Sequence, residues 1–454
     1  MKASKITRRT HFKGQCNFTE LPSKLIYLNS GTEGSMPNCV IKTFRKHLKK
    51  WASNPTTSQE TDPVLGKRQK KNRKKFAGYL GVQLNNICLT NNTTMGLSMV
   101  LIGLNFQAED KIVITDHEHP AITSPLWVLK QKLGIQLEVR PFPEPAQLRQ
   151  MNSEQLLDSL FPDIPELQNA KALCISHVYN TTGVRLPLDK IRQRADELNI
   201  SYLIVDGAQA MGVVDFNNLE NRLDNCDFYA APTHKWMNGP PGTGLLYIRN
   251  TKLCPPEFYP PLSQKMGAYM SGDDVESCLP MAEALQVRGC TNTPANVAVI
   301  RLMKFYNKIG GQAVVENHIL DLSCKVRDFI ASKAPDSLIS PSDTELQSGL
   351  VSFYPFKWDE PQTCFKDEET AVWVVKELLK KGVQVRFVPF PTVDFSPDCQ
   401  LKKHEADLPR DCSGEPVDQT YAVRVSTGLF NTAEQIENFK KTLKDVLRSS
   451  LNTS

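Results

Sequence analysis

The sequence has 454 residues, of which 40% are hydrophobic and 23% are charged, and its formal net charge is +5. These values predict a globular protein with a sizeable core, built as two or three domains or as one large unit with a smaller one. The small net charge makes nucleic acid an unlikely partner. No apolar run approaches the roughly 18 residues of a membrane span, so we expect no membrane partner.

Cysteine usage and the N-terminal sequence bear on the cellular compartment. The 12 cysteines are scattered from Cys16 to Cys412, without a C-x-x-C pair or a cysteine–histidine cluster of zinc spacing. We therefore expect free thiols in a reducing compartment and no metal site. Paired arginines near the N-terminus are followed by a polar stretch rather than an apolar one. We interpret residues 1–28 as an N-terminal arm and expect a cytoplasmic protein.

The first part of the chain alternates short apolar segments with helical ones. We predict helices at residues 93–104 and 188–200, and strands at 86–90, 111–115, 172–176, 202–206, 226–231 and 244–248. Continuous apolar strands separated by helices indicate a mainly parallel sheet that is covered on both faces. Ligands of such sheets bind at the carboxyl ends of the strands, so the polar residues after each strand are the candidate site.

The pattern changes after about residue 285. Helical patterns at 296–311, 369–382 and 432–451 alternate with strand-like segments at 350–356, 383–390 and 421–428. We predict a large α/β domain over residues 29–285 and a smaller α+β domain over residues 286–454. Residues 391–420 are polar and rich in proline, which is typical of a long functional or disordered loop.

A basic run at residues 67–75 holds seven basic residues in nine. Such a run contacts nucleic acid or an acidic partner in some proteins. Because the rest of the chain is not basic, we favour the solvated face of a helix.

Polar residues follow the first two predicted strands. Thr93 and Thr94 come where a helix begins, so they would cap that helix, and the free N–H groups of its first turn could bind a phosphate. His117 and His119 follow the strand 111–115 and could be metal ligands, a platform for an aromatic ligand or turn residues. Because they alternate in an extended segment, only one of them is expected to face a given site. We interpret His117 as structural, and likewise His177.

Asp206 and Lys235 suggest a particular chemistry. Asp206 ends a buried strand and either caps the next turn or serves a charged partner. Lys235 lies in a loop rich in glycine and proline between two apolar strands, and a lysine of lowered pKa forms a Schiff base with a carbonyl. A phosphate cradle, a stacking histidine, an acid and a lysine together suit pyridoxal 5'-phosphate (PLP).

Taken together, these motifs resemble the class V aminotransferase family, which includes cysteine desulfurases, cysteine C–S lyases and isopenicillin N epimerase-like proteins. The resemblance runs from about residue 27 to the C-terminal helix and is most specific at DGAQ (206–209) and THKWMNGPPGTGLLY (233–247). It implies an α/β fold, the PLP-dependent transferase fold type I. This fold has a mainly parallel seven-stranded sheet in the large domain and a smaller α+β C-terminal domain.

The resemblance also implies how the cofactor would be held. Lys235 would carry the Schiff base and move protons, and Asp206 would pair with the pyridine nitrogen. His119 would stack on the ring and, with Lys235, is our catalytic candidate. The phenolic oxygen would be contacted by Gln209 and Asn180, and the phosphate by Thr93, Thr94 and His234.

Substrate binding and dimerisation follow from the same resemblance. Arg424 would grip the α-carboxylate of an amino-acid substrate as a bidentate fork, with Asn29 to Gly31 close to the same carboxylate. Family members are usually homodimers in which a residue of the partner chain reaches the phosphate. Cys290 stands where that residue is usually a threonine, so we expect Thr291 or a neighbour to act instead. Pro232 likewise replaces a common phosphate-binding serine or asparagine.

The resemblance fixes the reaction less closely than the cofactor. We favour a cysteine C–S lyase or desulfurase-like reaction, with epimerisation or transamination as alternatives. A desulfurase needs a nucleophilic cysteine above the ring, and Cys399 or Cys412 in the long polar loop could supply it. An alternative of another class is an inactive PLP-binding homologue that acts as a binding protein, through residues 67–75 for example.

Overall fold

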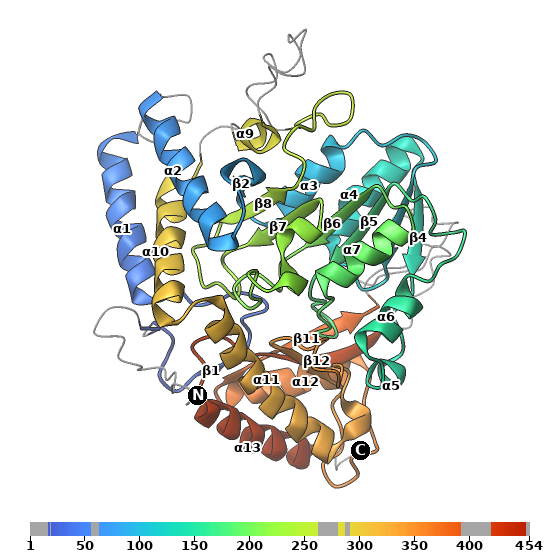
Figure 1. The fold of residues 1–454 in the computed structure, drawn as a ribbon. Coiled ribbons are helices and arrows are strands. Elements are labelled where there is room, and N and C mark those ends of the chain that lie inside the picture. Colours follow the sequence, from blue (N-terminus) through green and yellow to red (C-terminus); the bar gives the residue numbers. More distant parts are fainter. Residues whose placement is uncertain are drawn as a thin grey trace.

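The computed structural model describes residues 17–18, 20–55, 63–261, 280–286, 291–391 and 419–450, without the side chains of residues 63–68 and 449–450. The described residues form a seven-stranded sheet, a three-stranded sheet and a two-stranded sheet, and Figure 1 shows the three-stranded sheet below the seven-stranded one. No helix in these ranges is both long and apolar enough to cross a membrane. Cys399 and Cys412 lie outside the described residues.

The large sheet has seven strands in the order β2-β8-β7-β6-β5-β3-β4. Only β8 runs antiparallel to its neighbours, so the prediction of a mainly parallel seven-stranded sheet is confirmed. The strands are β2 (Ile87–Thr90), β3 (Lys111–Thr115), β4 (Gln136–Arg140), β5 (Ala172–Ser176), β6 (Tyr202–Asp206), β7 (Phe228–Pro232) and β8 (Gly244–Ile248).

Side chains of successive strand residues enter two separate cores, one on each face of this sheet. Leu173 and Ile175 of β5 join one core, whereas Ala172 and Cys174 join the other. This alternation follows from the two-residue period of a strand. The first core includes residues of α2 (Pro63–Leu80), α6 (Ser153–Leu160), α7 (Leu188–Glu197) and α10 (Thr293–Ile309). The second includes residues of α3 (Thr93–Gly103), α4 (Pro120–Leu133) and α9 (Met281–Gln286).

The small sheet is antiparallel, in the order β11-β12-β9, and covers the carboxyl-end side of the large one. Its strands are β9 (Leu350–Phe353), β11 (Arg386–Phe390) and β12 (Thr420–Ser426). A third core joins it to α11 (Gln312–Lys333), α12 (Glu368–Lys380) and α13 (Ala433–Ser450). The first strand of the chain, β1 (Ile26–Tyr27), pairs in parallel with β10 (Val383–Gln384) next to this core.

The remaining elements join these layers. Helix α10 packs against α1 (Asn38–Ser53) and α2, beside the large sheet. The domain boundary at residues 285 and 286 stays a prediction. The short elements are α5 (Pro145–Leu148) and the 3-10 turns η2 (Leu84–Asn86), η3 (Leu219–Asn221), η4 (Leu223–Asn225) and η6 (Pro335–Ser337).

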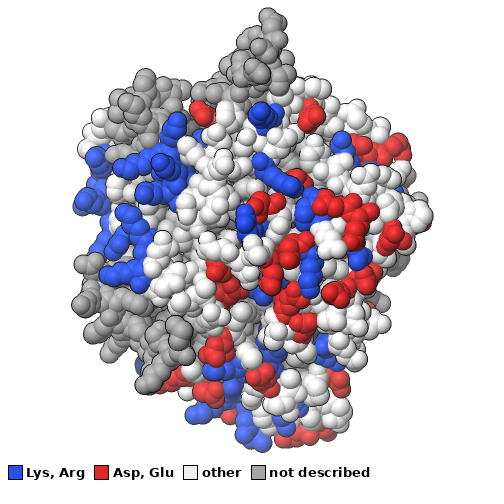
Figure 2. Space-filling view, viewed as in Figure 1, with Lys and Arg blue, Asp and Glu red and all other residues white. Residues whose placement is uncertain are grey.

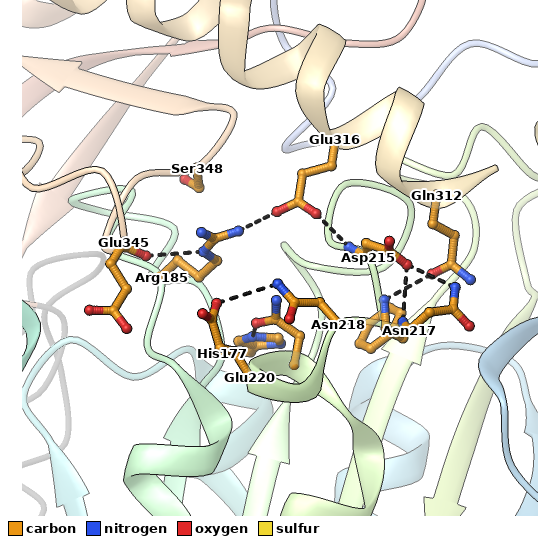
Figure 3. A network of polar contacts seen from close by, with 12 residues as sticks. His177, Arg185, Asp215, Asn217, Asn218, Glu220, Gln312, Glu316, Glu345 and Ser348 are labelled. Atoms are coloured by element: carbon orange, nitrogen blue, oxygen red, sulfur yellow. Dashed lines mark hydrogen bonds and ion pairs between the residues drawn. The ribbon is translucent and has the colours of Figure 1, made fainter. Parts of the chain in front are cut away.

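A polar network fixes α11 to loops of the large sheet, as Figure 3 shows. Arg185 forms an ion pair with Glu316 of α11 and donates from Nε to the backbone oxygen of Glu345 at 3.2 Å. The second carboxylate oxygen of Glu316 accepts the backbone N–H of Asp215 at 2.9 Å. Because each side chain bridges different segments, the network holds the two sheets in a defined orientation.

The basic run 67–75 lies within α2, as predicted, and much of it faces solvent. Lys70, Lys71, Lys74 and Lys75 are exposed, and Figure 2 shows Lys and Arg gathered over α1 and α2. Arg73 is buried instead, and its Nε donates to the backbone oxygen of Ile87 at 2.7 Å.

Most described cysteines form no disulfide bond, namely Cys88, Cys174, Cys226, Cys254, Cys324 and Cys364. Cys39 is disulfide-bonded, so the expectation of free thiols is wrong for this residue. Spacing within the sequence could not predict this bond, because a disulfide depends on which segments the fold brings together.

Candidate active site

A cavity of about 670 Å³ lies where the carboxyl ends of the large sheet meet the small sheet. Its volume is that of a typical small-molecule site. Of the predicted site residues, it is lined by Gly31, Thr93, Thr94, His119, Asn180, Asp206, Gln209, His234, Lys235 and Arg424. Asn29 and Thr291 do not line it. The convergence follows from topology, because parallel strands end at one edge of a sheet.

Lys235 projects from the loop that connects β7 and β8. The loop is closed by the backbone bond from Thr233 N–H to the oxygen of Thr243 at 3.0 Å, and Asn238 adopts a left-handed φ of 61° within it. Trp236 is 1% exposed, and its backbone oxygen accepts the hydroxyl of Tyr306 at 3.1 Å. The backbone on either side of the lysine is therefore held firmly.

The amine of Lys235 is left free to react. Among the described residues, none forms a hydrogen bond or ion pair with its Nζ. The pKa of this amine is lowered to about 8, chiefly by burial; the charge of Asp206 opposes this shift, and the charges of Arg424 and Arg386 add to it. A larger fraction of the amine is thus neutral near physiological pH, which is the form that attacks a carbonyl.

Asp206 ends β6 and is 2% exposed. One carboxylate oxygen accepts the backbone N–H of Ala208 at 2.7 Å, while the side chain also lines the cavity. Capping the turn and serving a charged partner are therefore compatible roles. Burial raises the pKa of the carboxyl to about 6, although the charge of Lys235 works in the other direction.

Gln209 is oriented by two hydrogen bonds. Its Oε1 accepts the indole N–H of Trp236 at 2.8 Å, and its Nε2 donates to the backbone oxygen of Gly31 at 3.0 Å. Since the indole nitrogen only donates, the amide orientation is fixed. The second N–H of Nε2 remains available to an oxygen in the cavity.

His119 is the N-cap of α4, and its Nδ1 accepts the backbone N–H of Ala121 at 3.1 Å. Burial, together with Lys235, Arg386 and Arg424, lowers the pKa of the imidazole to about 4. The ring is thus neutral at physiological pH, and because Nδ1 accepts, Nε2 carries the hydrogen. It presents a neutral aromatic face to the cavity.

His117 and His177 lie outside the cavity, which agrees with the structural role predicted for them. Nδ1 of His117 contacts the hydroxyl of Thr181 at 2.8 Å, and the ring stacks on Phe142 with centroids 4.6 Å apart. Nδ1 of His177 contacts the hydroxyl of Tyr229 at 2.9 Å. Both rings are buried among partners of their own.

The N-terminus of α3 lines the cavity with Asn92, Thr93 and Thr94. Its N-cap is Asn92, which accepts the backbone N–H of Met95 at 2.8 Å, so capping by Thr93 or Thr94 was a wrong prediction. Asparagine competes well for this position, and here it comes one residue earlier. The hydroxyl of Thr93 is buried without a hydrogen-bond partner, and Thr94 is exposed to the cavity.

Arg424 is a buried cation without a described carboxylate partner. It is 2% exposed, and it donates from Nη1 to the backbone oxygen of Asn180 at 3.1 Å and from Nη2 to Thr32 Oγ1 at 3.0 Å. Its Nε is buried and unpaired. Burial and the neighbouring Arg386 lower the pKa of the guanidinium to about 9. A buried cation with free donors is a receptor for an anion.

The two predicted residues outside the cavity have other contacts. Asn29 accepts the hydroxyl of Thr32 at 2.8 Å and so holds the residue that supports Arg424. The hydroxyl of Thr291 is buried and accepts from Gln69 Nε2 at 3.0 Å. A role at a partner chain's phosphate stays a prediction, since one chain is described.

Three residues of this region were not predicted from the sequence. Thr32 directly follows the predicted segment 29–31, so the same motif could have predicted it. Arg386 lines the cavity from β11. An arginine within an otherwise apolar strand segment could have indicated a functional residue. Glu118 is buried behind His119, accepts from Thr115 and Ser176 at 2.9 and 2.7 Å, and its pKa is raised by burial to about 8.

These residues fit PLP by their own chemistry. The unpaired hydroxyl of Thr93 at a helix N-terminus suits a phosphate. The free amine of Lys235 suits the aldehyde, and the buried carboxyl of Asp206 suits a protonated ring nitrogen. The unpaired Nε of Arg424 suits the carboxylate of an amino acid.

The fold and cavity together define an enzyme of the PLP-dependent transferase fold type I. A cysteine desulfurase from Thermococcus onnurineus, solved in its apo form, matches 93% of this chain and 95% of its own, with a TM-score of 0.69 and 21% identity. The complex of the cystine C–S lyase C-DES with its product cysteine persulfide matches 93% of this chain and 98% of its own, with a TM-score of 0.67 and 21% identity.

Sequence comparison gives the family. The profile described as Aminotransferase class-V matches residues 26–364, and the chain therefore belongs to the class V aminotransferase family. The family depends on PLP, which is the cofactor of this chain.

Two curated relatives carry different activities in their names. A probable cysteine desulfurase from Pyrococcus abyssi is 26% identical over 298 residues, which is 64% of this chain and 69% of the relative. An isopenicillin N epimerase from Streptomyces clavuligerus is 25% identical over 349 residues, which is 73% of this chain and 81% of the relative. The relatives thus agree on the family and differ in the reaction.

Proposed function

We propose that this enzyme cleaves the bond between the β-carbon and sulfur of a cysteine-type amino acid, as a C–S lyase or a desulfurase. The observation that carries the proposal is one cavity in which the free amine of Lys235, the buried carboxyl of Asp206 and the buried cation of Arg424 converge. The names of the desulfurase relatives and of the lyase with a similar fold support sulfur chemistry in particular.

Each of these residues has a defined task in the proposal. PLP, when bound, withdraws electrons from the bonds of an amino acid's α-carbon. Arg424 binds the α-carboxylate and thereby fixes the orientation of the α-carbon. Lys235 then accepts the α-proton at Nζ, for which a pKa near 8 is suitable. Asp206 would supply a negative charge to the ring nitrogen of the cofactor, and the neutral ring of His119 would supply an aromatic contact.

The choice between lyase and desulfurase depends on a cysteine that can take up sulfur. None of the described cysteines lines the cavity. The candidates Cys399 and Cys412 lie outside the described residues. A lyase needs no such thiol and releases pyruvate and sulfur, whereas a desulfurase leaves alanine and a persulfide on the protein. The products formed by Cys399→Ala and Cys412→Ala separate these reactions.

Epimerisation is the second candidate, and the observation in its favour is the similarity to an isopenicillin N epimerase. Exchange of the α-hydrogen for solvent deuterium without any other product would support it. Transamination would instead give a keto acid and an aminated cofactor. The inactive binding protein of the sequence analysis has no support, because the free amine and the buried acid share one cavity.

We also propose a cytoplasmic homodimer. Thr291, which the family resemblance brings to the partner's phosphate, accepts a hydrogen bond from Gln69 of α2. Sedimentation of the holoenzyme tests the dimer. The affinity of Thr291→Val for PLP tests the role of Thr291, because a loss of affinity is expected only if Thr291 acts across the dimer. Fractionation of the source cells tests the compartment.

Product analysis is the decisive experiment. The holoenzyme would be incubated with cysteine, cystine and a cysteine sulfoxide in deuterated buffer, and the products identified by mass spectrometry. We expect pyruvate and released sulfur, or alanine and protein persulfide. An unchanged substrate that carries deuterium would contradict C–S cleavage and favour the epimerase. A matched Lys235→Ala sample gives the background without the proposed amine.

A further inference from the structure

Two arginines face each other across neighbouring strands at the cavity. Arg386 of β11 is the direct cross-strand partner of Arg424 of β12, and both line the cavity. Both also donate to the same hydroxyl, that of Thr32, at 3.4 and 3.0 Å. Like charges directly opposite each other destabilise a sheet, so this arrangement calls for an explanation.

The chain supplies no counter-charge to this pair in its described part. No carboxylate of the described residues lies within 4 Å of either guanidinium, although Glu368 also lines the cavity. Burial and the charge of Arg386 both lower the pKa of Arg424, so the two cations repel each other. Anions bound in the cavity would relieve this repulsion, because bidentate arginine pairs with oxyanions are strong.

The two guanidinium groups lie at different depths. Arg424 is buried beside Asn180, and its Nε has no hydrogen-bond partner. Arg386 is exposed and lines the cavity together with Gln419 and Tyr421 on the side of the small sheet. Apart from the long bond to Thr32, no residue in the described part of the chain occupies the remaining donors of Arg386. A single carboxylate can satisfy one bidentate fork, and Arg386 therefore keeps donors for another anion.

We propose that Arg386 binds a second anionic group at the end of the substrate side chain. The substrate is then an α-amino acid that carries a distal carboxylate or sulfur oxyanion, with its α-carboxylate on Arg424. This inference rests on the proposed function for the role of Arg424. It makes Arg386 the residue that determines specificity, since a neutral side chain would leave the paired cations uncompensated.

An isosteric pair of ligands tests the proposal. S-carboxymethyl-L-cysteine and its neutral amide have the same length and the same sulfur, and they differ in the distal charge. We expect the holoenzyme to prefer the acid by at least about tenfold in kcat/KM. Arg386→Gln should remove this preference by lowering kcat/KM for the acid alone, and Arg386→Lys should restore part of it, because lysine keeps the charge without the fork.

A binding measurement separates this proposal from the proposed reaction. Glutarate and its monoamide have no amine and cannot react, and their affinities for the holoenzyme can be measured by calorimetry. We expect glutarate to bind at least about tenfold more tightly, and Arg386→Gln to abolish the difference. Arg45→Gln on α1, outside the cavity, should retain it.

The outcomes are distinct. If the calorimetric preference is found but no amino acid turns over, the anion site stands and the proposed reaction fails. If turnover is found while acid and amide are used equally, or while Arg386→Gln weakens both ligands alike, the distal-anion site is wrong. The last result would mean that both arginines hold the α-carboxylate.

Discussion

Replacing Arg424 by methionine tests the site sharply, because the structure predicts opposite consequences for activity and for stability. The guanidinium is buried, has no described carboxylate partner and keeps an unpaired Nε. Removing it takes away the receptor for the substrate carboxylate. It also removes a charge that folding has to bury next to another cation.

The loss of activity follows from the energy of a buried charged hydrogen-bond pair. Truncating one partner of such a pair costs about 2–5 kcal/mol. At about 1.4 kcal/mol for each factor of ten, kcat/KM should fall by about 30-fold to about 5,000-fold. Arg424→Lys should lose less, because it keeps the charge.

The effect on stability should be small or favourable. Folding lowers the pKa of Arg424 from its ordinary value to about 9, and each pH unit of this lowering is worth about 1.4 kcal/mol against the buried cation. The cost is thus on the order of 5 kcal/mol, and it is partly offset by the bonds to Asn180 and Thr32, each worth about 1.5–3 kcal/mol. We expect the free energy of unfolding of Arg424→Met to stay within about 2 kcal/mol of the wild type.

Arg185→Met is the matched control. Arg185 is also largely buried, but it forms an ion pair with Glu316 outside the cavity. Breaking this pair leaves a buried carboxylate and should cost about 3–5 kcal/mol of stability. Urea unfolding of the apoenzymes and steady-state kinetics of the holoenzymes measure both quantities. The reasoning is refuted if Arg424→Met unfolds as easily as Arg185→Met, or if its kcat/KM stays within threefold of the wild type.

Further predictions concern the buried titrating groups. The apoenzyme should gain stability as pH rises from about 8 to 10.5, because Lys235 in the unfolded chain binds a proton that the folded amine has released. Equal slopes of the free energy of unfolding against pH in Lys235→Met and the wild type would contradict this. Asp206→Asn should lower the pKa of that amine further and reduce kcat at least about 100-fold, as measured by pH-dependent amine labelling and kinetics; unchanged labelling would contradict it. Glu118 should be protonated in the fold at pH 7, so stability falls as pH rises from 4.5 to about 8. In Glu118→Gln, the free energy of unfolding measured in urea should depend less on pH over this range. A variant that is less stable than the wild type at pH 8 would show that the carboxylate is ionised in the folded protein.

The fold of the large sheet could be predicted because its central strands are apolar along their whole length. Strands such as 172–176 and 202–206 are buried on both faces and have the predicted bounds. Strand β4 was missed, because it lies at the edge of the sheet. Its residues are exposed or half-buried, so the sequence at 136–140 lacks a continuous apolar run.

The site could be predicted wherever its residues follow strands of the parallel sheet. Asp206 and Lys235 meet because strand ends share an edge, which the alternation of strands and helices already implies. Arg386 could not be found this way. Its position depends on the antiparallel register that sets it opposite Arg424, and a stretch of chain between the two strands hides that pairing from the sequence. Thr93 and Thr94 were predicted at the right place but with the wrong capping role, which Asn92 takes.

The central claim is that one amine, that of Lys235, forms the covalent link to the cofactor. Borohydride reduction of the yellow holoenzyme, followed by digestion and mass spectrometry, tests it most directly. We predict bleaching of the colour and the mass of the reduced cofactor on the peptide that contains Lys235, with none in Lys235→Ala. Attachment to another lysine, or release of all the cofactor on denaturation after reduction, would contradict the account.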